Sequence, residues 1–361
     1  MSSGKSLGNT GRRCYFRLLF LALLSLTTVA FGPPALRERD AAGLKLYPCQ
    51  LRELAESHPP SVEAKAFLLA DFTTGTVILA QNEHEKLPPA SLTKIMTAVL
   101  ALEKSSLSDT VVVGKGVTGL EPPSLGLWPG QKISMENLLY GLLLISANDA
   151  AAAIAEHIAG SQEAFVEMMN QKAAELGMQD THFVNPQGFD AEGHLSTAYD
   201  LWLLTRYALA NPTFAAIVST RERGGLFSSN RFLSLYPGAD GVKTGTTPLA
   251  GECLAASATR GNQKGVVILL NSPDRYGEAA SLLDFYFRNY ALVPLSYPAL
   301  DSVKGPSGEV SALKVEGGNN ILVEKWKFPL LRFYRSISSG ELLVYLGDKV
   351  LLSRPLRVEK Q

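Results

Sequence analysis

Three short motifs in this chain carry side chains whose types and spacing are suited to chemistry at a carbonyl carbon. In the first, PPASLTKIMTA, Ser91 precedes Lys94 by three residues, and two prolines mark the start of the predicted helix that carries both. An offset of three places the two side chains on one helix face. Serine becomes a nucleophile when a base takes its proton, and a neutral lysine can be that base.

Lys94 can act as a base only when its amine is neutral. The pKa of Lys94 must fall from ~10.4 towards ~7, which takes about 4–5 kcal/mol from desolvation or from a second cation. A helix beginning at Ser91 would place free N–H groups and the positive end of its dipole beside the hydroxyl, where they can stabilise an oxyanion. The spacing alone is weak, because Ser2 and Lys5 repeat it near the N-terminus.

The second motif, Ser146-Ala147-Asn148, lies at a break between two apolar helical segments. A hydroxyl and a carboxamide on such a connector can face a common cleft. Either side chain could instead simply cap the following helix. Ser228 and Asn230 repeat the same spacing, so this motif is also weak by itself.

The third motif is Lys243-Thr244-Gly245-Thr246, at the end of a predicted strand. An ammonium group and hydroxyls suit a carboxylate ligand, and Gly245 lets a substrate backbone lie close to the strand. A solvated strand end is the alternative. The three motifs follow in order, with 55 residues from Ser91 to Ser146 and 97 from Ser146 to Lys243. Serine-x-x-lysine, serine-x-asparagine and lysine-threonine-glycine in this order are typical of penicillin-interacting acyl-transfer enzymes.

The elements that must position these motifs indicate an α+β fold. A β-hairpin with its turn at Thr73-Thr74-Gly75 comes first, and three strands follow residue 236. Helices fill the sequence between, so the sheet joins distant segments and the helical middle forms a second lobe. Helices are expected from Ser91, over 135–145, 148–160 and 161–177, after Thr197 and over 275–290, with loops at 120–131 and 179–196.

Composition narrows the class of protein. The chain has 361 residues, which is long for a single core, and a short-strand pattern over 298–361 predicts a separate small β domain. With 34 basic and 34 acidic residues there is no cationic field to bind nucleic acid. No cofactor or metal is expected: the three cysteines form no CxxC and are expected as free thiols, and His182 and His194 are interpreted as structural.

The N-terminus predicts export. Basic residues precede an uncharged run of 14 residues, Leu18–Phe31, which fits a signal-peptide core and is short for a membrane span. Small residues at Thr28 and Ala30 suggest cleavage after Ala30. The open alternatives are an uncleaved N-terminal anchor and a twin-arginine signal. We therefore divide the chain into a signal peptide (1–30), a lead-in segment (31–60), a catalytic domain (61–292) and the β domain (298–361).

Taken with their surroundings, the motifs resemble those of the D-alanyl-D-alanine carboxypeptidases, low-molecular-weight penicillin-binding proteins of the peptidase S11 family. The resemblance runs from about Ser61 to Tyr290 and includes the stretches LADFTTGTVILAQNEHEKLPPASLTKIMTA, FVNPQGFD and DGVKTGTTPLAGECLAASATR. It implies a β-lactamase/transpeptidase-like catalytic domain, with an antiparallel sheet covered by helices and a helical lobe. It also implies a serine-type hydrolase that removes the terminal D-alanine from peptidoglycan stem pentapeptides and is blocked by β-lactam antibiotics.

The resemblance also implies roles for single residues. Ser91 would be the acylated nucleophile, Lys94 its base, and Ser146 a proton relay to the leaving amine. Asn148 would hold the substrate amide. The terminal carboxylate would bind Lys243 and Thr244, beside Gly245, and Lys243 would help to keep Lys94 neutral. The backbone N–H groups of Ser91 and Thr246 would form the oxyanion hole.

Several alternatives stay open at this point. A class A β-lactamase needs a glutamate followed four residues later by an asparagine, and no glutamate between Ser146 and Lys243 meets this pattern. Cleavage of D,D cross-links and an inactive wall-binding scaffold are the others. Many relatives end in an amphipathic membrane-binding helix, whereas ELLVYLGDKVLLSRPLRVEKQ alternates like strands. The expected location is the cell envelope, either membrane-associated or released.

Overall fold

A computed structural model describes residues 57–295, 302–304, 310–315, 320–336 and 340–360. The predicted signal peptide, Cys14 and Cys49 lie outside the described residues. The chain divides into two compact units: one is His58–Leu292, and the other contains Val293–Gln361. Among the described residues, none of the helices has the length and apolar character needed to cross a bilayer.

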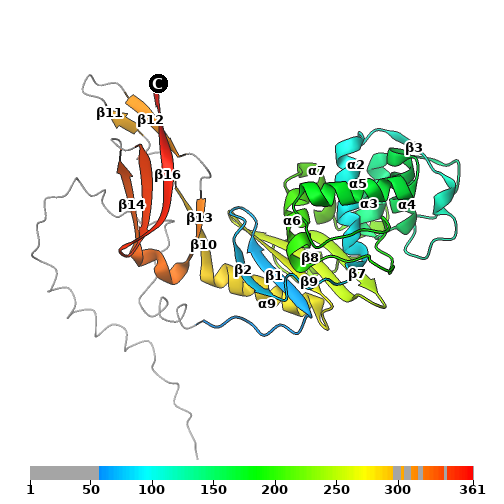
Figure 1. Ribbon diagram of the computed structural model, residues 1–361, viewed down its shortest axis with the longest axis horizontal. Helices are drawn as coiled ribbons and strands as arrows, with labels where there is room; N and C mark the ends of the chain where they lie inside the picture. Colours follow the sequence, from blue (N-terminus) through cyan, green and yellow to red (C-terminus); the bar gives the residue numbers. More distant parts are fainter. Residues whose placement is uncertain (1–56, 296–301, 305–309, 316–319, 337–339, 361) are drawn as a thin grey trace, which may run out of the picture. The chain divides into compact units, whose positions relative to one another are not determined.

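The larger unit is built on a five-stranded antiparallel sheet in the order β2-β1-β9-β8-β7 (Figure 1). The first two strands form the predicted hairpin, and the other three come from the far end of the unit, so distant segments meet as expected. The strand bounds are β1 Ala66–Asp71, β2 Val77–Gln81, β7 Ala239–Thr247, β8 Gly251–Arg260 and β9 Gln263–Leu270. This order leaves β7, which carries Lys243, at an edge of the sheet.

Both faces of the sheet are covered. Leu68 and Ala70 of β1 belong to a core shared with the helical lobe, while the alternate side chains of Phe67 and Leu69 are buried on the other face. On that other face lies α9 (Arg275–Asn289), which packs on β8 and β9. The strands of this sheet therefore have nearly continuous apolar sequences, rather than a strict alternation of apolar and polar residues.

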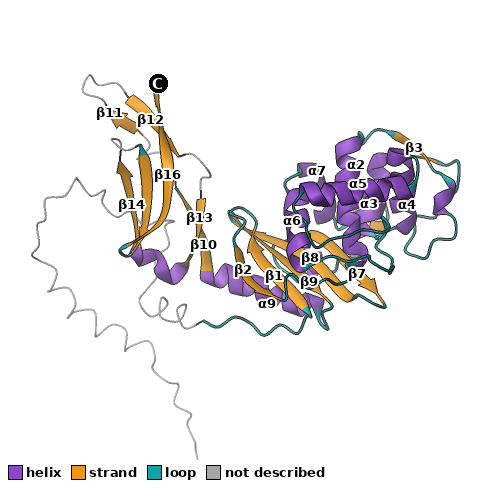
Figure 2. Cartoon of the chain, viewed as in Figure 1, coloured by secondary structure: helices purple, strands orange, loops and turns teal. Residues whose placement is uncertain are grey.

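The helical lobe is drawn in purple beside the sheet of the larger unit in Figure 2. Its helices begin at the expected caps, since Ser134, Ser161 and Thr197 each accept a backbone hydrogen bond from the residue three positions on. Gly160 ends a helix with φ +80°. The helices are η1 Ala90–Thr93, α2 Lys94–Lys104, α3 Met135–Leu144, α4 Asn148–Ala159, α5 Gln162–Glu175, α6 Ala198–Leu209, α7 Pro212–Ser219 and α8 Phe232–Leu235.

Three local features differ from the expectation. The helix predicted from Ser91 begins as the 3₁₀ turn η1, and the α-helix starts at Lys94. Sequence reasoning also missed two small hairpins, β3–β4 (Thr110–Val112 and Lys132–Ser134) and β5–β6 (Glu222–Arg223 and Leu226–Phe227). Strands of two or three residues are too short to give a periodic pattern.

The smaller unit is β-rich, as predicted. Its main sheet has the order β11-β12-β16-β15-β14, and β10 pairs with β13. The last strand, β16, runs to Lys360, so the described C-terminal residues form strands rather than an amphipathic helix. The bounds are β10 Tyr290–Pro294, β11 Ser302–Lys304, β12 Val310–Val315, β13 Asn320–Glu324, η3 Lys325–Leu330, β14 Leu331–Ser336, β15 Glu341–Leu346 and β16 Lys349–Lys360.

Candidate active site

The turn that carries Ser91 is held from two sides by glycine backbones. A Cβ atom built on Gly188 would lie 2.0 Å from the carbonyl oxygen of Ala90, and one on Gly245 would lie 3.0 Å from the backbone nitrogen of Ser91. Ala90 itself has φ +48°, a left-handed conformation that is costly for a residue with a Cβ atom. Gly245 was expected to make room for a substrate, and it also makes room for the Ser91 turn.

Lys94 is completely buried, and three oxygen atoms surround its Nζ atom. Nζ lies 2.9 Å from Ser91 Oγ, 2.8 Å from Asn148 Oδ1 and 2.6 Å from the backbone oxygen of Gln187. The amide oxygen and the carbonyl oxygen can only accept hydrogen bonds. The predicted Ser91–Lys94 pair is therefore formed, and residues 54 and 93 positions away from Lys94 complete its environment.

This environment suits a neutral amine. Burial lowers the pKa of Lys94 well below its ordinary value, and the nearby charge of Lys243 lowers it further. A neutral amine has two N–H groups and one lone pair. In the neutral form, Asn148 and Gln187 would accept the two N–H groups, and the lone pair would face Ser91 Oγ. Sequence reasoning anticipated both causes, and burial is the larger one.

Ser146 lies on the connector between α3 and α4, as predicted, and Asn148 directly follows that connector. Ser146 has φ +64°, a strained backbone for a non-glycine residue, of the kind that occurs at functional sites. Asn148 is the first residue of α4, and its Nδ2 atom donates to the carbonyl oxygen of Glu121 at 2.8 Å. Both ends of its carboxamide are thus engaged inside the protein, so Asn148 orients Lys94 in addition to any contact with substrate.

Lys243 is also completely buried, and its Nζ atom donates to the backbone oxygen of Thr244 at 2.8 Å. Burial, followed by the nearby charge of Arg275, lowers the pKa of Lys243 to about 7. The cation expected from the sequence is therefore only partly charged at neutral pH when no anion is bound. A bound carboxylate would favour the protonated form, because opposite charges stabilise each other.

Arg275, the first residue of α9, is a site residue that sequence reasoning missed. Its Nη1 atom donates to the backbone oxygen of Gly245 at 3.0 Å and to Thr246 Oγ1 at 2.9 Å. Its Nε atom lies 3.6 Å from a carboxylate oxygen of Glu252. An arginine 29 residues after Thr246 has no motif to reveal it, because the contact depends on α9 folding back over the sheet.

The loop that supplies the Gln187 carbonyl was predicted as a loop but not as part of the site. It is tied to the end of β7 by Asp190, which accepts from Thr247 Oγ1 at 2.6 Å and from the backbone nitrogen of Leu249 at 3.0 Å. The loop therefore connects Lys94 with the strand that carries Lys243.

His194 packs against the turn that carries Ser91. Its Nδ1 atom accepts from the backbone nitrogen of Val184 at 2.9 Å, so Nε2 carries the proton and donates to Thr93 Oγ1 at 2.9 Å. Burial, and then the charge of His182, lower the pKa of His194 to about 4. The imidazole is therefore neutral at physiological pH and holds the turn from behind.

The structure brings Ser91, Lys94, Asn148 and Gly245 into direct contact or close approach, and Ser146 precedes Asn148 by two residues. The repeated motif at Ser228–Asn230 instead stabilises the turn before α8: Ser228 Oγ accepts from the backbone nitrogen of Asn230, and Asn230 Oδ1 accepts from that of Phe232. Cys253 is a free, buried thiol. The described residues contain no group of three His, Cys, Asp or Glu side chains placed to hold a metal ion.

Comparison with known proteins gives one consistent family. A family model described as D-alanyl-D-alanine carboxypeptidase (peptidase S11) matches residues 53–274. The D-alanyl-D-alanine carboxypeptidase DacF of Bacillus subtilis is 35% identical over 296 residues, which cover 77% of this chain and 73% of that protein. DacC of Escherichia coli is 38% identical over 260 residues, covering 65% of this chain and 64% of that protein.

Solved structures agree with the sequence relatives. Penicillin binding protein 6B from Escherichia coli matches with a TM-score of 0.72 and 30% identity, over 83% of this chain and 96% of that one. The Streptomyces K15 DD-transpeptidase matches with a TM-score of 0.61 and 30% identity, over 64% of this chain and 99% of that one. The fold is thus the penicillin-binding, transpeptidase-like fold expected from the motifs.

Proposed function

The chain belongs to the peptidase S11 family of D-alanyl-D-alanine carboxypeptidases, and from this membership we propose that it is a serine hydrolase that removes the terminal D-alanine of peptidoglycan stem peptides through an acyl-enzyme on Ser91. The observation that carries the proposal is the buried Lys94 amine, 2.9 Å from Ser91 Oγ with its other two neighbours fixed as acceptors.

Acylation begins with proton transfer from Ser91 Oγ to Lys94 Nζ. The oxygen then attacks the carbonyl carbon of the penultimate D-alanine and forms a tetrahedral intermediate. The backbone N–H groups of Ser91 and Thr246 are assigned to the oxyanion. The intermediate collapses as the C–N bond breaks, and the proton on Lys94 passes through the Ser146 hydroxyl to the leaving amine. The products are free D-alanine and an ester on Ser91.

Hydrolysis of the ester uses the same groups in reverse order. Lys94, neutral again after the leaving amine has taken its proton, accepts a proton from water, and the hydroxide attacks the ester carbonyl. The C–O bond to Ser91 breaks and Oγ recovers its proton. The overall reaction consumes one water and yields a tetrapeptide and D-alanine. A β-lactam would acylate Ser91 by opening of its ring amide, so that no leaving group departs.

Substrate recognition is assigned to β7. Lys243 and Thr244 are proposed to bind the terminal carboxylate of the peptide, with Gly245 leaving space beside the strand. The strand edge of the sheet offers backbone groups to an extended peptide. Because burial lowers the pKa of Lys243 to about 7, carboxylate binding is expected to be accompanied by proton uptake above that pH.

We further propose that the protein works outside the cytoplasm in the cell envelope, where peptidoglycan is found. The predicted signal peptide and the names of its relatives, D-alanyl-D-alanine carboxypeptidases, support this location. The carboxypeptidase activity is favoured over cleavage of D,D cross-links by the names of the relatives, DacF and DacC among them.

Product analysis tests the activity directly. Purified protein and a stem pentapeptide should give free D-alanine and tetrapeptide, while Ser91→Ala should release none. Penicillin should add its mass to the wild type at Ser91. Ser228→Ala, at the repeated motif outside the site, should behave like the wild type. Absence of D-alanine with the wild type, or equal release from Ser91→Ala, would refute the proposal.

The same preparation separates the alternatives. Release of cross-linked products from a purified dimeric muropeptide at a rate comparable to D-alanine release would favour the endopeptidase. Rapid multiple turnover of penicillin, rather than a lasting adduct, would favour the β-lactamase.

A further inference from the structure

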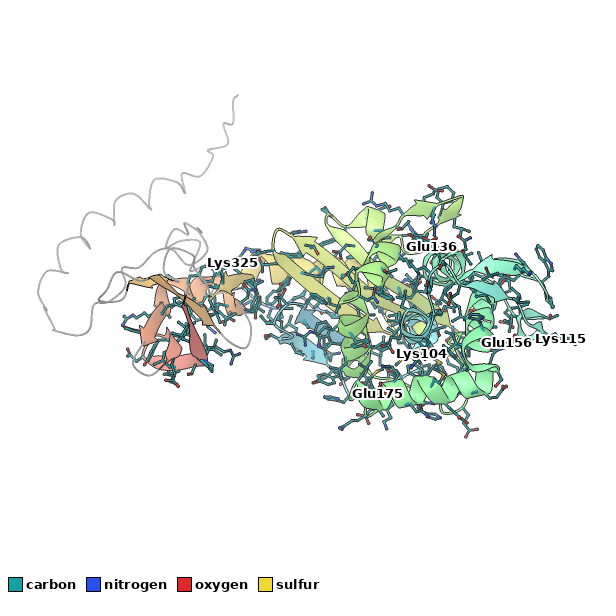
Figure 3. All side chains as sticks on the ribbon, turned by 90° about the horizontal axis from the view of Figure 1, so that it is seen from above. Lys104, Lys115, Glu136, Glu156, Glu175 and Lys325 are labelled. Carbon is teal, nitrogen blue, oxygen red and sulfur yellow. The ribbon has the colours of Figure 1, made fainter. Side chains whose placement is uncertain are left out.

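The outer surface of α3 carries two hollows that share one aromatic side chain. A hollow of about 290 Å³ is lined by Tyr140 together with residues of the 125–133 segment and of the β5–β6 hairpin. A second, of about 270 Å³, is lined by Tyr140, Glu136 and the first turns of α7. We call the pair the α3 groove. Its polar lining is Gln131, Glu136, Asn137, Tyr140, Thr213 and Arg223, and its other lining residues are apolar or glycine. Figure 3 labels Glu136, which lies on the helical part of the larger unit.

The polar groups of the α3 groove form a set with no net charge. The guanidinium of Arg223 lies 3.8 Å over the Tyr140 ring and 3.0 Å from Glu136 Oε2. Its Nη1 atom is buried and has no acceptor among the described residues, although such a donor normally has a partner. The carboxamides of Gln131 and Asn137 complete the set. These groups suit a neutral ligand with hydroxyl and amide groups. A charged peptide would instead need an unpaired charge of opposite sign in the groove.

Two exposed aromatic residues follow, in the sequence, residues that line this groove. Trp128 follows Leu127 and is 62% exposed, and Phe227 follows Leu226 and is 71% exposed. Exposed aromatic rings near a hollow lined by apolar and polar side chains are typical of binding surfaces, because the ring offers an apolar face while polar groups supply hydrogen bonds. Sugar rings have the matching character, with apolar C–H faces and polar edges.

One wall of the groove is joined to the catalytic site. The carboxylate of Asp149, next to Asn148, accepts from the backbone nitrogens of Leu125 and Leu127 at 2.9 and 3.0 Å. An extended peptide of four or five residues spans about 13–18 Å. A stem peptide bound with one end at Ser91 can therefore carry the attached sugar up to about 13–18 Å away from the reacting bond.

We propose that the α3 groove binds the N-acetylated sugar residues of the peptidoglycan strand to which the stem peptide is attached. The inference rests on the proposed function, since it concerns the remote part of the same substrate. Two hollows that share Tyr140 suit a linear polymer of repeated units. Binding energy from a remote part of a substrate can be used to accelerate the reaction, so the groove would favour strand-linked stems over free peptides.

The test compares two substrates with one set of variants. Trp128→Ala and Arg223→Ala should each lower kcat/KM by about tenfold on stem pentapeptides linked to uncross-linked glycan strands, the loss expected for one binding contact. On a free pentapeptide both variants should stay within about twofold of the wild type, a difference below one typical contact. Tyr334→Ala, which removes an exposed aromatic side chain from the other compact unit, serves as the matched control and should change neither rate.

Direct binding gives a second measurement. Oligomers of N-acetylglucosamine should shift NMR signals of the wild type saturably, and the shifts should disappear in Arg223→Ala and persist in Ser91→Ala. Equal loss of both activities in the groove variants would assign the groove to the peptide and overturn the proposal, as would unchanged activity on strand-linked stems. Failure of the proposed function itself would appear differently, as absence of D-alanine release from free pentapeptide by the wild type.

Discussion

Lys94 Nζ lies 2.9 Å from Ser91 Oγ, and both of its other polar neighbours are oxygen atoms that cannot donate a proton to it. A neutral Lys94 amine fits this arrangement: its two N–H groups donate to Asn148 and Gln187, and its lone pair faces Ser91. The hydrogen-bond geometry is therefore compatible with the neutral form that catalysis needs, and burial and the charge of Lys243 favour that form.

Replacing Asn148 by aspartate should change the pH dependence of acylation. A carboxylate at the position of Oδ1, 2.8 Å from Lys94 Nζ, would stabilise the ammonium form and raise the pKa of Lys94. Compared with the wild type at the same pH, the acylation rate by penicillin should be about 10- to 100-fold lower at pH 7, the effect of one to two pKa units, and this difference should shrink as the pH rises. Stopped-flow acylation across pH 6–10 measures this, with the exposed turn residue Asn262→Asp as control. A reduced rate that does not recover at high pH would contradict the explanation.

The alkaline limb of the activity profile is assigned to Lys243. Because the pKa of Lys243 is about 7 in the free enzyme, kcat/KM for the pentapeptide should decline as the pH rises above that value and the carboxylate-binding cation is lost. Arg275 contributes to lowering this pKa, so Arg275→Met should move the limb to higher pH even if the maximal rate falls. Arg260→Met, on the β8–β9 hairpin, is the control. A limb that stays in place, or moves to lower pH, would exclude the assigned cause.

Gly245→Ala should damage both stability and acylation. The new Cβ atom would lie 3.0 Å from the Cβ atom of Ala90 and from the nitrogen of Ser91, so β7 and the nucleophile turn must separate. Overpacking of this kind costs about 1–3 kcal/mol of unfolding free energy. Gly261→Ala is the matched variant, since φ is +61° there but no atom lies within 4 Å. It should lose about 1 kcal/mol and keep its penicillin acylation rate. Equal acylation by both variants would show that the contact at Gly245 does not position Ser91.

Lys243→Met should stabilise the protein while abolishing activity. The pKa of Lys243 falls from 10.5 to about 7 on folding, so between these values the unfolded chain binds more protons than the native protein. The unfolding free energy of the wild type should therefore rise with pH across that window. Methionine removes the burial cost, which is about 4–5 kcal/mol at neutral pH for a pKa shift of this size. Urea titrations at pH 7 and pH 10 measure both effects, and a variant less stable than the wild type at pH 7 would contradict the explanation.

The fold and the motifs could be predicted where the information is local. Ser91 and Lys94 are one turn apart, and the caps at Ser134, Ser161 and Thr197 are set by the residues that follow them. The order of the three motifs then indicated a common cleft. The carbonyl of Gln187 could not be found in this way, because every residue carries such a group and only the fold selects this one. Arg275 was missed because its contact with Gly245 depends on how α9 packs on the sheet.

The depressed basicity of Lys94 exists only when three distant parts of the chain enclose it. In an unfolded chain its amine is solvated and protonated at neutral pH, and Ser91 has no base. A chain carried across a membrane before folding would therefore react neither with substrates nor with β-lactam antibiotics. Acylation of this protein by penicillin therefore reports that its tertiary structure has formed. During refolding, the ability to react with penicillin should appear only after the Gln187 loop has closed over Lys94.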